Sequence, residues 1–112
     1  MNFPVDLTDM ADKADDVSAF LKGFASGHRL MILCKLSEGE ASVGELIEAT
    51  GLAQTSMSQH LAKLKTEGLV DYRRDHRTLY YFIAHPAVME IMAVLYRHFC
   101  AKDRSSCPPP KR

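Results

Sequence analysis

Three cysteines are the residues of this 112-residue chain whose chemistry is most distinctive. Cys34 lies within the apolar run LMILCKL, and Cys100 and Cys107 lie near the C-terminus. Thiolates form disulfides and bind soft metal ions. A free cysteine also packs well as a small hydrophobic residue, and Cys34 falls on the apolar stripe of a predicted helix. An inert, buried thiol is therefore the alternative to a reactive one.

The compartment determines whether such thiols start out reduced. No apolar run is long enough to span a membrane, and the acidic N-terminal stretch MNFPVDLTDMADKADD does not resemble a signal peptide. We therefore expect a cytoplasmic protein with reduced thiols and no structural disulfide framework. Any cysteine chemistry would then depend on the redox state. A chain of this length forms one domain and gains from self-association, so we also expect a homodimer.

Hydrophobic periodicity and capping residues predict the elements that position these residues. The predicted helices cover residues 9–22, 27–38, 43–49, 54–67 and 86–103, the first capped by Thr8 or Asp9. Residues 69–74 and 78–83 are β-rich and form a predicted hairpin. The sequence predicts one domain over 1–104, with a helix-turn-helix reading motif at 43–67 and a wing at 69–83. The tail 105–112, SSCPPPKR, is expected to be disordered. The fold class is mainly α with a β-hairpin wing, a winged helix-turn-helix.

The helix over 54–67 has the side chains of a base-reading helix. Met57, Leu61 and Leu64 are expected to face the core. The predicted exposed residues are Gln54, Thr55, Ser56, Ser58, Gln59, His60 and Lys63. Gln can bond adenine, Ser and Thr reach bases or phosphates, and Lys binds phosphate. An inert solvated helix usually alternates acids and bases, which this face does not. The pattern therefore predicts binding to double-stranded DNA.

Charge is distributed in a way that agrees with this prediction. The net charge of the chain is zero, but residues 1–16 hold five acids and one lysine, whereas residues 54–77 hold five bases and three acids. The predicted wing carries Arg73, Arg74, His76 and Arg77. We expect these wing residues to follow the DNA backbone, where they add affinity and salt dependence without choosing a sequence.

The segment SVGELIEATGLAQTSMSQHLAKLKTEGLVDYRRDHRTLYYFIA, with the helices on either side of it, resembles the ArsR-type winged-helix repressors from about residue 16 to 100. The resemblance implies a symmetric dimer formed by the first and last helices and bound to an imperfect inverted repeat. The chain departs from the family pattern at two places. Ala53 precedes Gln54 where the family often has Ser, and Asp75-His76 replaces the frequent Asp-Gly, which puts a side chain at a turn position that favours positive φ.

The cysteine motifs resemble one subgroup of that family, the BigR and SqrR type. Its ILC in the second helix and FC at the end of the last helix match LMILC and RHFC here. The resemblance implies a dithiol sensor of persulfides, in which Cys34 and Cys100 are crosslinked and DNA is released; Cys107 is not part of the pattern. Helix axes pack about 8–10 Å apart, whereas a disulfide needs Cα atoms within about 7 Å. We hypothesise that this gap favours a bridge lengthened by inserted sulfur over direct oxidation by peroxide.

Other readings of the sequence remain open. No cysteine lies between Lys35 and Phe99, and Glu90 and His98 are spaced poorly for a shared site, so no metal cofactor is expected. An arsenite or cadmium sensor using all three cysteines is the nearest alternative. A redox-responsive activator or anti-repressor is another. Catalysis is not expected, because the chain lacks Cys-x-x-Cys, a glycine-rich phosphate loop and a recognisable nucleophile and base.

Overall fold

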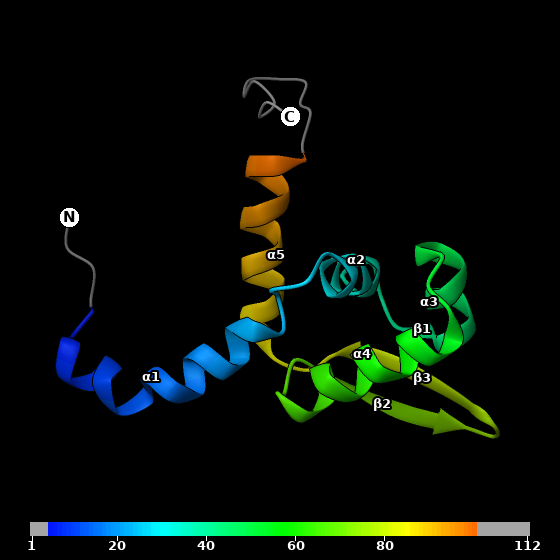
Figure 1. Cartoon of the computed structure of the whole chain (residues 1–112), viewed down its shortest axis with the longest axis horizontal. Coiled ribbons are helices and arrows are strands. Elements are labelled where there is room, and N and C mark those ends of the chain that lie inside the picture. The colour runs from blue at the N-terminus through cyan, green and yellow to red at the C-terminus, as the bar shows by residue number, and fades with distance from the viewer. Residues whose placement is uncertain (1–4, 101–112) are drawn as a thin grey trace.

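The computed structural model describes residues 5–100. Five helices and three strands follow one another in this range (Figure 1). In chain order they are α1 (Leu7–Lys22), α2 (Gly27–Leu36), β1 (Ala41–Ser42), α3 (Val43–Thr50), α4 (Gln54–Thr66), β2 (Val70–Asp75), β3 (Thr78–Ile83) and α5 (Pro86–Phe99). The winged helix-turn-helix prediction is confirmed. The predicted tail, Cys107 and the last residues of the predicted 86–103 helix lie outside the described residues.

The hydrophobic core lies between α2, α3, α4 and the sheet. Ile32 and Leu33 of α2 are completely buried, as is Leu46 of α3. The three α4 residues predicted to face inward, Met57, Leu61 and Leu64, are buried as expected. The core also includes Leu69 just before β2, Val70 and Tyr81 of the sheet, and Val88 of α5. This core fixes the orientation of α4, and therefore decides which of its side chains reach solvent.

The sheet has three antiparallel strands in the order β1-β3-β2. The β2–β3 hairpin was predicted, but the two-residue β1 was not, because so short a strand has no periodicity to detect. At the hairpin turn, His76 adopts a φ of 62°, which confirms the predicted positive φ. Its imidazole Nδ1 lies 3.0 Å from a carboxylate oxygen of Asp75. A side chain thus occupies a backbone conformation that usually favours glycine or asparagine.

Local capping explains most helix boundaries. In α3 the Ser42 hydroxyl accepts from the Glu45 amide and the Glu45 carboxylate accepts from the Ser42 amide, the predicted capping box. Ala53 caps α4 without a side-chain hydrogen bond. The predicted cap of the first helix was wrong. Asp6 caps α1 by accepting from the Thr8 amide, so the helix begins at Leu7. Among the helices of residues 5–100, none is long and apolar enough to cross a membrane.

Helices α1 and α5 extend away from this core (Figure 1). No residue of α1 is buried in the protomer, and its Leu7 and Leu21 are 81% and 47% exposed. At the far end of α5, Phe99 is 66% exposed. Large apolar side chains on two projecting helices are typical of surfaces that another protein covers.

Candidate DNA-binding surface and thiol groove

Helix α4 presents three distinct surfaces outside the core. A rotation of about 100° per residue puts Thr55, Gln59 and Thr66 directly opposite the buried side. All three are exposed. Gln54 and Ser58 lie on the flank next to the wing, and the other predicted reading residues, Ser56, His60 and Lys63, lie on the flank next to α2. The seven predicted residues are therefore divided among three surfaces rather than forming one uniform face.

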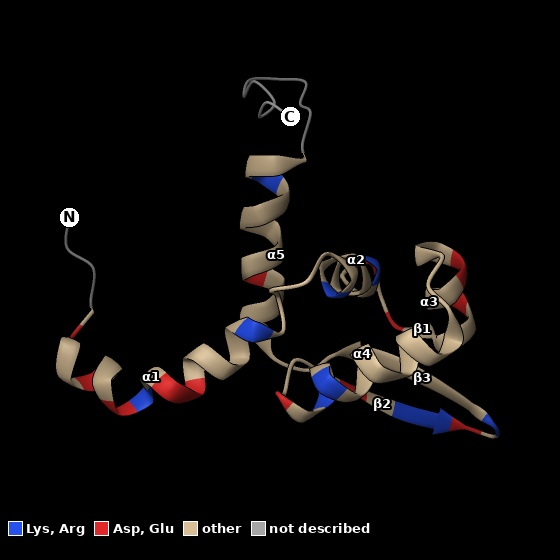
Figure 2. Ribbon diagram, in the orientation of Figure 1, with Lys and Arg blue, Asp and Glu red and all other residues tan. Residues whose placement is uncertain are grey.

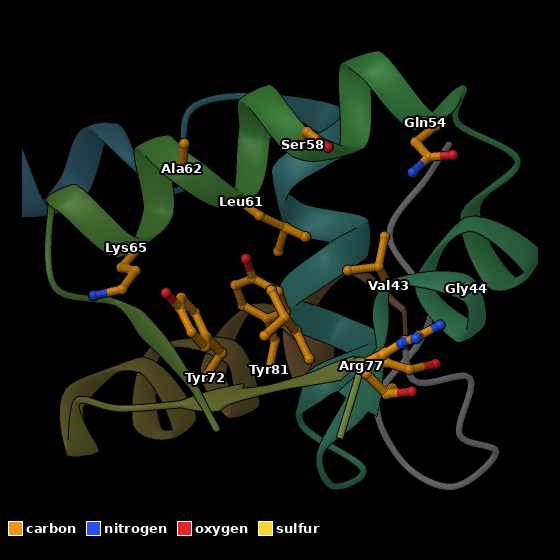
Figure 3. Close-up of a pocket in the computed structure, with 13 residues that line it drawn as sticks. Val43, Gly44, Gln54, Ser58, Leu61, Ala62, Lys65, Tyr72, Arg77 and Tyr81 are labelled. Atoms are coloured by element: carbon orange, nitrogen blue, oxygen red, sulfur yellow. The ribbon is translucent and has the colours of Figure 1, made fainter. Parts of the chain in front are cut away.

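A groove of about 710 Å³ separates α4 from the wing (Figure 3). Gln54 and Ser58 line it from α4, and Arg77 lines it from the hairpin. The rings of Tyr72 and Tyr81 rise from the sheet toward α4, with Lys65 at one end of the groove and Arg77 at the other (Figure 3). Hydroxyl, amide and cationic groups that face one groove suit the sugar-phosphate backbone of DNA.

A second groove, of about 580 Å³, lies on the α2 flank of α4. Arg29 reaches into it from α2, beside His60 and Lys63. Arg29 Nη1 lies 3.3 Å from His60 Nδ1, and Arg29 Nε and Nη2 donate to the carbonyls of Gly23 and Lys22 at 3.3 and 3.1 Å. His60 is half-buried in this contact, and Ser56 on the same flank is half-buried as well, so the prediction that both are exposed was wrong.

The electrostatics of this second groove are unfavourable for an additional positive charge. The pKa of His60 is lowered, first by burial and then by the positive charges of Arg29, His28 and Lys63. The rings of His28 and His60 meet edge to face, with their centroids 5.5 Å apart. One acid, Glu67, also lines the groove. No ion pair of Arg29 or Lys63 with a carboxylate occurs within residues 5–100.

The four predicted wing residues are not equivalent. Arg73 forms a bidentate ion pair with Glu40, and its guanidinium lies 4.7 Å from the centroid of the Tyr80 ring. The Arg73 hydrogen bond lowers the pKa of the Glu40 carboxyl. Because side chains alternate along a strand, Arg73 faces away from Tyr72, which lines the α4 groove. Arg74 and Arg77 form no ion pair within the described range.

Cys34 does not lie in the core. The expectation that it belongs to the inward stripe of its helix was wrong, because α2 buries Ile32, Leu33 and Leu36 and leaves Cys34 exposed. Cys34 and Cys100 are both free thiols and line the same groove between α2 and α5, of about 380 Å³. The other lining residues are all apolar or aromatic, namely Leu30, Met31, Met92, Leu95, Tyr96 and Phe99. The fold thus brings together two thiols that are far apart in the sequence.

Comparison with known proteins identifies the family of this chain. Residues 26–72 match the arsR family of bacterial regulatory proteins. The chain is 36% identical over 98 residues to a biofilm growth-associated repressor of Xylella fastidiosa, covering 88% of this chain and 86% of the relative. It is 37% identical over 101 residues to the transcriptional activator HlyU of Vibrio cholerae, covering 90% and 94%. The chain belongs to the ArsR family. The predicted family is therefore confirmed.

Solved structures of similar regulators share this fold over most of the chain. The repressor BigR of Xylella fastidiosa superposes with a TM-score of 0.78 at 36% identity, covering 88% of this chain and all of that one. A winged helix-turn-helix domain from Mycobacterium bovis, described as homodimeric, gives 0.72 at 36% identity, covering 87% and 88%. These relatives are regulators, so this ArsR-family member is a DNA-binding transcriptional regulator, as predicted, and not an enzyme.

Three residues of these grooves were absent from the sequence prediction. Lys65 lies seven residues after Ser58, two helical turns along the same flank, so helical spacing alone had the information to include it. Tyr72 lines the wing groove because of the strand alternation. Arg29 has no sequence signal, since it comes from α2, 31 positions before the histidine that it contacts.

Proposed function

We propose that this ArsR-family regulator is a homodimeric repressor whose affinity for its operator is lowered when reactive sulfur crosslinks Cys34 and Cys100. The observation that carries the proposal is that both thiols line one apolar groove between α2 and α5. An isolated structural thiol does not need a second one beside it. Relatives support both parts of the proposal, since one is a biofilm growth-associated repressor of Xylella fastidiosa and one solved structure is that of reduced HlyU from Vibrio cholerae.

Atoms and electrons balance in crosslink formation, with no further oxidant, if two persulfide molecules, RSSH, are consumed. The Cys34 thiolate takes the outer sulfur of the first persulfide, and RSH leaves. The Cys34 persulfide then attacks the inner sulfur of the second, expelling hydrogen sulfide. Cys100 finally displaces RSH and closes a trisulfide. Two thiols are oxidised, and the outer sulfur of the second persulfide is reduced to hydrogen sulfide.

The position of the bridge suggests how it lowers DNA affinity. A bridge from α2 to α5 ties the helix that contacts α4 through Arg29 to a helix that extends from the core. The affinity falls only by as much as the crosslink disfavours the DNA-competent arrangement of the two reading helices in the dimer.

The proposed dimer uses α1 and α5, whose apolar side chains are exposed in the protomer. Two copies related by a twofold axis would present two α4 helices to an imperfect inverted repeat. Gln54, Thr55, Ser56, Ser58, Gln59 and Lys63 are the proposed α4 contacts with DNA, and Arg74, His76 and Arg77 those from the wing. Because the bacterial operator is cytoplasmic, we place the protein there.

The test combines chemistry with DNA binding. Reduced protein is treated with glutathione persulfide or hydrogen peroxide, and its tryptic peptides are identified by mass. We expect a Cys34–Cys100 peptide pair with added sulfur after persulfide only, together with weaker operator binding by fluorescence anisotropy. Cys34→Ser and Cys100→Ser should stay bound to DNA, and Cys107→Ser serves as the matched control. A crosslinked protein that binds operator as tightly as the reduced one would contradict the proposal.

Two alternatives are separated by simple experiments. A soft-metal sensor would use Cys107 as a third thiolate, so deleting residues 105–112 would abolish the response to arsenite and leave a dithiol switch unaffected. Within residues 5–100 no three His, Cys, Asp or Glu side chains gather as a metal site, while Cys107 lies beyond that range.

The second alternative is a role as activator, and the similarity to the activator HlyU supports it. The position of the operator relative to the promoter decides between repression and activation.

A further inference from the structure

We propose that the groove of Arg29, His60 and Lys63 binds a backbone phosphate of DNA, on the side of α4 opposite the wing. This inference rests on the proposed function only in requiring that the protein binds duplex DNA through α4. It adds an anchoring site that comes from α2, a helix outside the helix-turn-helix motif.

Position is the first argument. The groove lies along α4, and Gln59, Ala62, Lys63 and Thr66 line it together with Arg29. Gln59 and Thr66 belong to the outermost surface of α4, so a duplex that contacts them passes this groove on one side and the wing groove on the other. Figure 2 shows cationic segments both on α2 and on the C-terminal half of α4.

Preorganisation is the second argument. Arg29 donates to two backbone carbonyls at the end of α1 and approaches His60, so its guanidinium is held in place before any ligand arrives. Arginine has five N–H donors, and these three contacts leave others for an anion. A guanidinium whose rotamer is already fixed loses less entropy on binding a phosphate than a free surface arginine would.

Uncompensated charge is the third argument. Arg29 and His28 contact His60, and burial together with the positive charges of Arg29, His28 and Lys63 lowers the pKa of that imidazole. Glu67 is the acid at the edge of the groove, and it forms no ion pair with Arg29 or Lys63 within the described residues. A phosphate placed between Arg29 and Lys63 relieves the mutual repulsion of these cations.

The test measures the salt dependence of binding to a mixed-sequence DNA duplex by fluorescence anisotropy. Each phosphate contact contributes about 0.9 to the slope of log K against log salt concentration. We expect Lys63→Gln to reduce the slope by about this amount and to weaken binding equally for all sequences. Lys63 is exposed and glutamine is a good helix former, so this variant should fold normally. Lys35→Gln is the matched control, because Lys35 pairs with Glu38 at the other end of α2.

Arg29→Gln provides the second arm, with its folding checked by circular dichroism and its Tm. It should also lower the slope, and Lys63→Gln added to it should bring little further loss if both contact one phosphate. An unchanged slope in Lys63→Gln, alongside a reduced slope in Lys65→Gln, would overturn the inference and leave the wing groove as the backbone contact. A wild-type protein that binds no duplex at all would instead contradict the proposed function.

Discussion

Arg29 Nη1 lies 3.3 Å from Nδ1 of His60, which connects the first turn of α2 to the middle of α4. The same guanidinium bonds the last carbonyls of α1. Cys34 lies five residues further along α2, so the helix that carries the thiol also contacts α4, the proposed DNA-reading helix. A change in the position of α2 would therefore be transmitted to α4 through this polar contact as well as through the hydrophobic core.

The contact makes the stability of the protein depend on the ionisation of His60. Its pKa in the folded state is below the ordinary value of 6.5. The unfolded chain therefore binds a proton more readily, so the contribution of His60 is fully present above pH 6.5 and is lost as the pH falls through the folded value. We expect the Tm of the wild type to fall more than that of His60→Gln between about pH 8 and pH 5.5. Equal changes in the two proteins would show that His60 is not perturbed.

Gly23 is predicted to be intolerant of a side chain because of close packing. A Cβ at this position would lie 2.7 Å from Leu69 Cδ2, and Leu69 is completely buried. We expect Gly23→Ala to lower the free energy of unfolding by about 1–3 kcal/mol in urea denaturation. Gly27→Ala is the control, since a Cβ there meets nothing within 4 Å, and it should leave stability unchanged or raised by up to about 1 kcal/mol. Similar losses in both variants would indicate a backbone effect instead.

Periodicity and capping were sufficient to predict the order of the helices, the wing and the inward residues of α4. Those signals are local, because a helix repeats every few residues and the Ser42–Glu45 capping box spans four positions. The position of Cys34 was predicted incorrectly since it lies beside Leu33 in an apolar run, and only the packing of α2 against its neighbours shows which of these side chains face inward.

Contacts between distant segments explain what else the sequence did not reveal. Arg73 looked like any wing arginine, but Glu40, 33 positions earlier, binds it. His60 was predicted to be exposed, but α2 places Arg29 beside it. Neither pairing leaves a periodic pattern, so a single sequence does not disclose them.

The Glu40–Arg73 ion pair leads to a prediction that separates the wing arginines. The Arg73 guanidinium is already paired with Glu40 and faces away from the α4 groove. Arg73→Gln should therefore weaken binding to a mixed-sequence duplex less than Arg74→Gln or Arg77→Gln does. Loss of one phosphate contact lowers the salt slope by about 0.9, and we expect that loss only in the latter two variants. Glu40→Gln would free Arg73 and is expected to keep or increase the slope. A larger loss in Arg73→Gln than in Arg74→Gln would mean that the ion pair opens when DNA binds.

The exposed stripe on α1 tests the proposed dimer. Met10, Val17 and Leu21 recur at helical spacing on a helix that buries no residue in the protomer. Each apolar side chain that is fully buried on association contributes about 1.5–3 kcal/mol, so Val17→Lys should raise the dimer dissociation constant by about tenfold or more. Light scattering coupled to size-exclusion chromatography measures the molecular mass over a dilution series, and so the dimer dissociation constant. Asp12→Asn is the control, because a rotation of about 100° per residue puts the exposed Asp12 on the side of α1 opposite the stripe. Because one α4 alone contacts only half of an inverted repeat, the monomeric variant should also lose operator affinity while its circular dichroism stays unchanged. An unaltered dimer in Val17→Lys would place the interface elsewhere and leave the apolar stripe of α1 without its proposed partner.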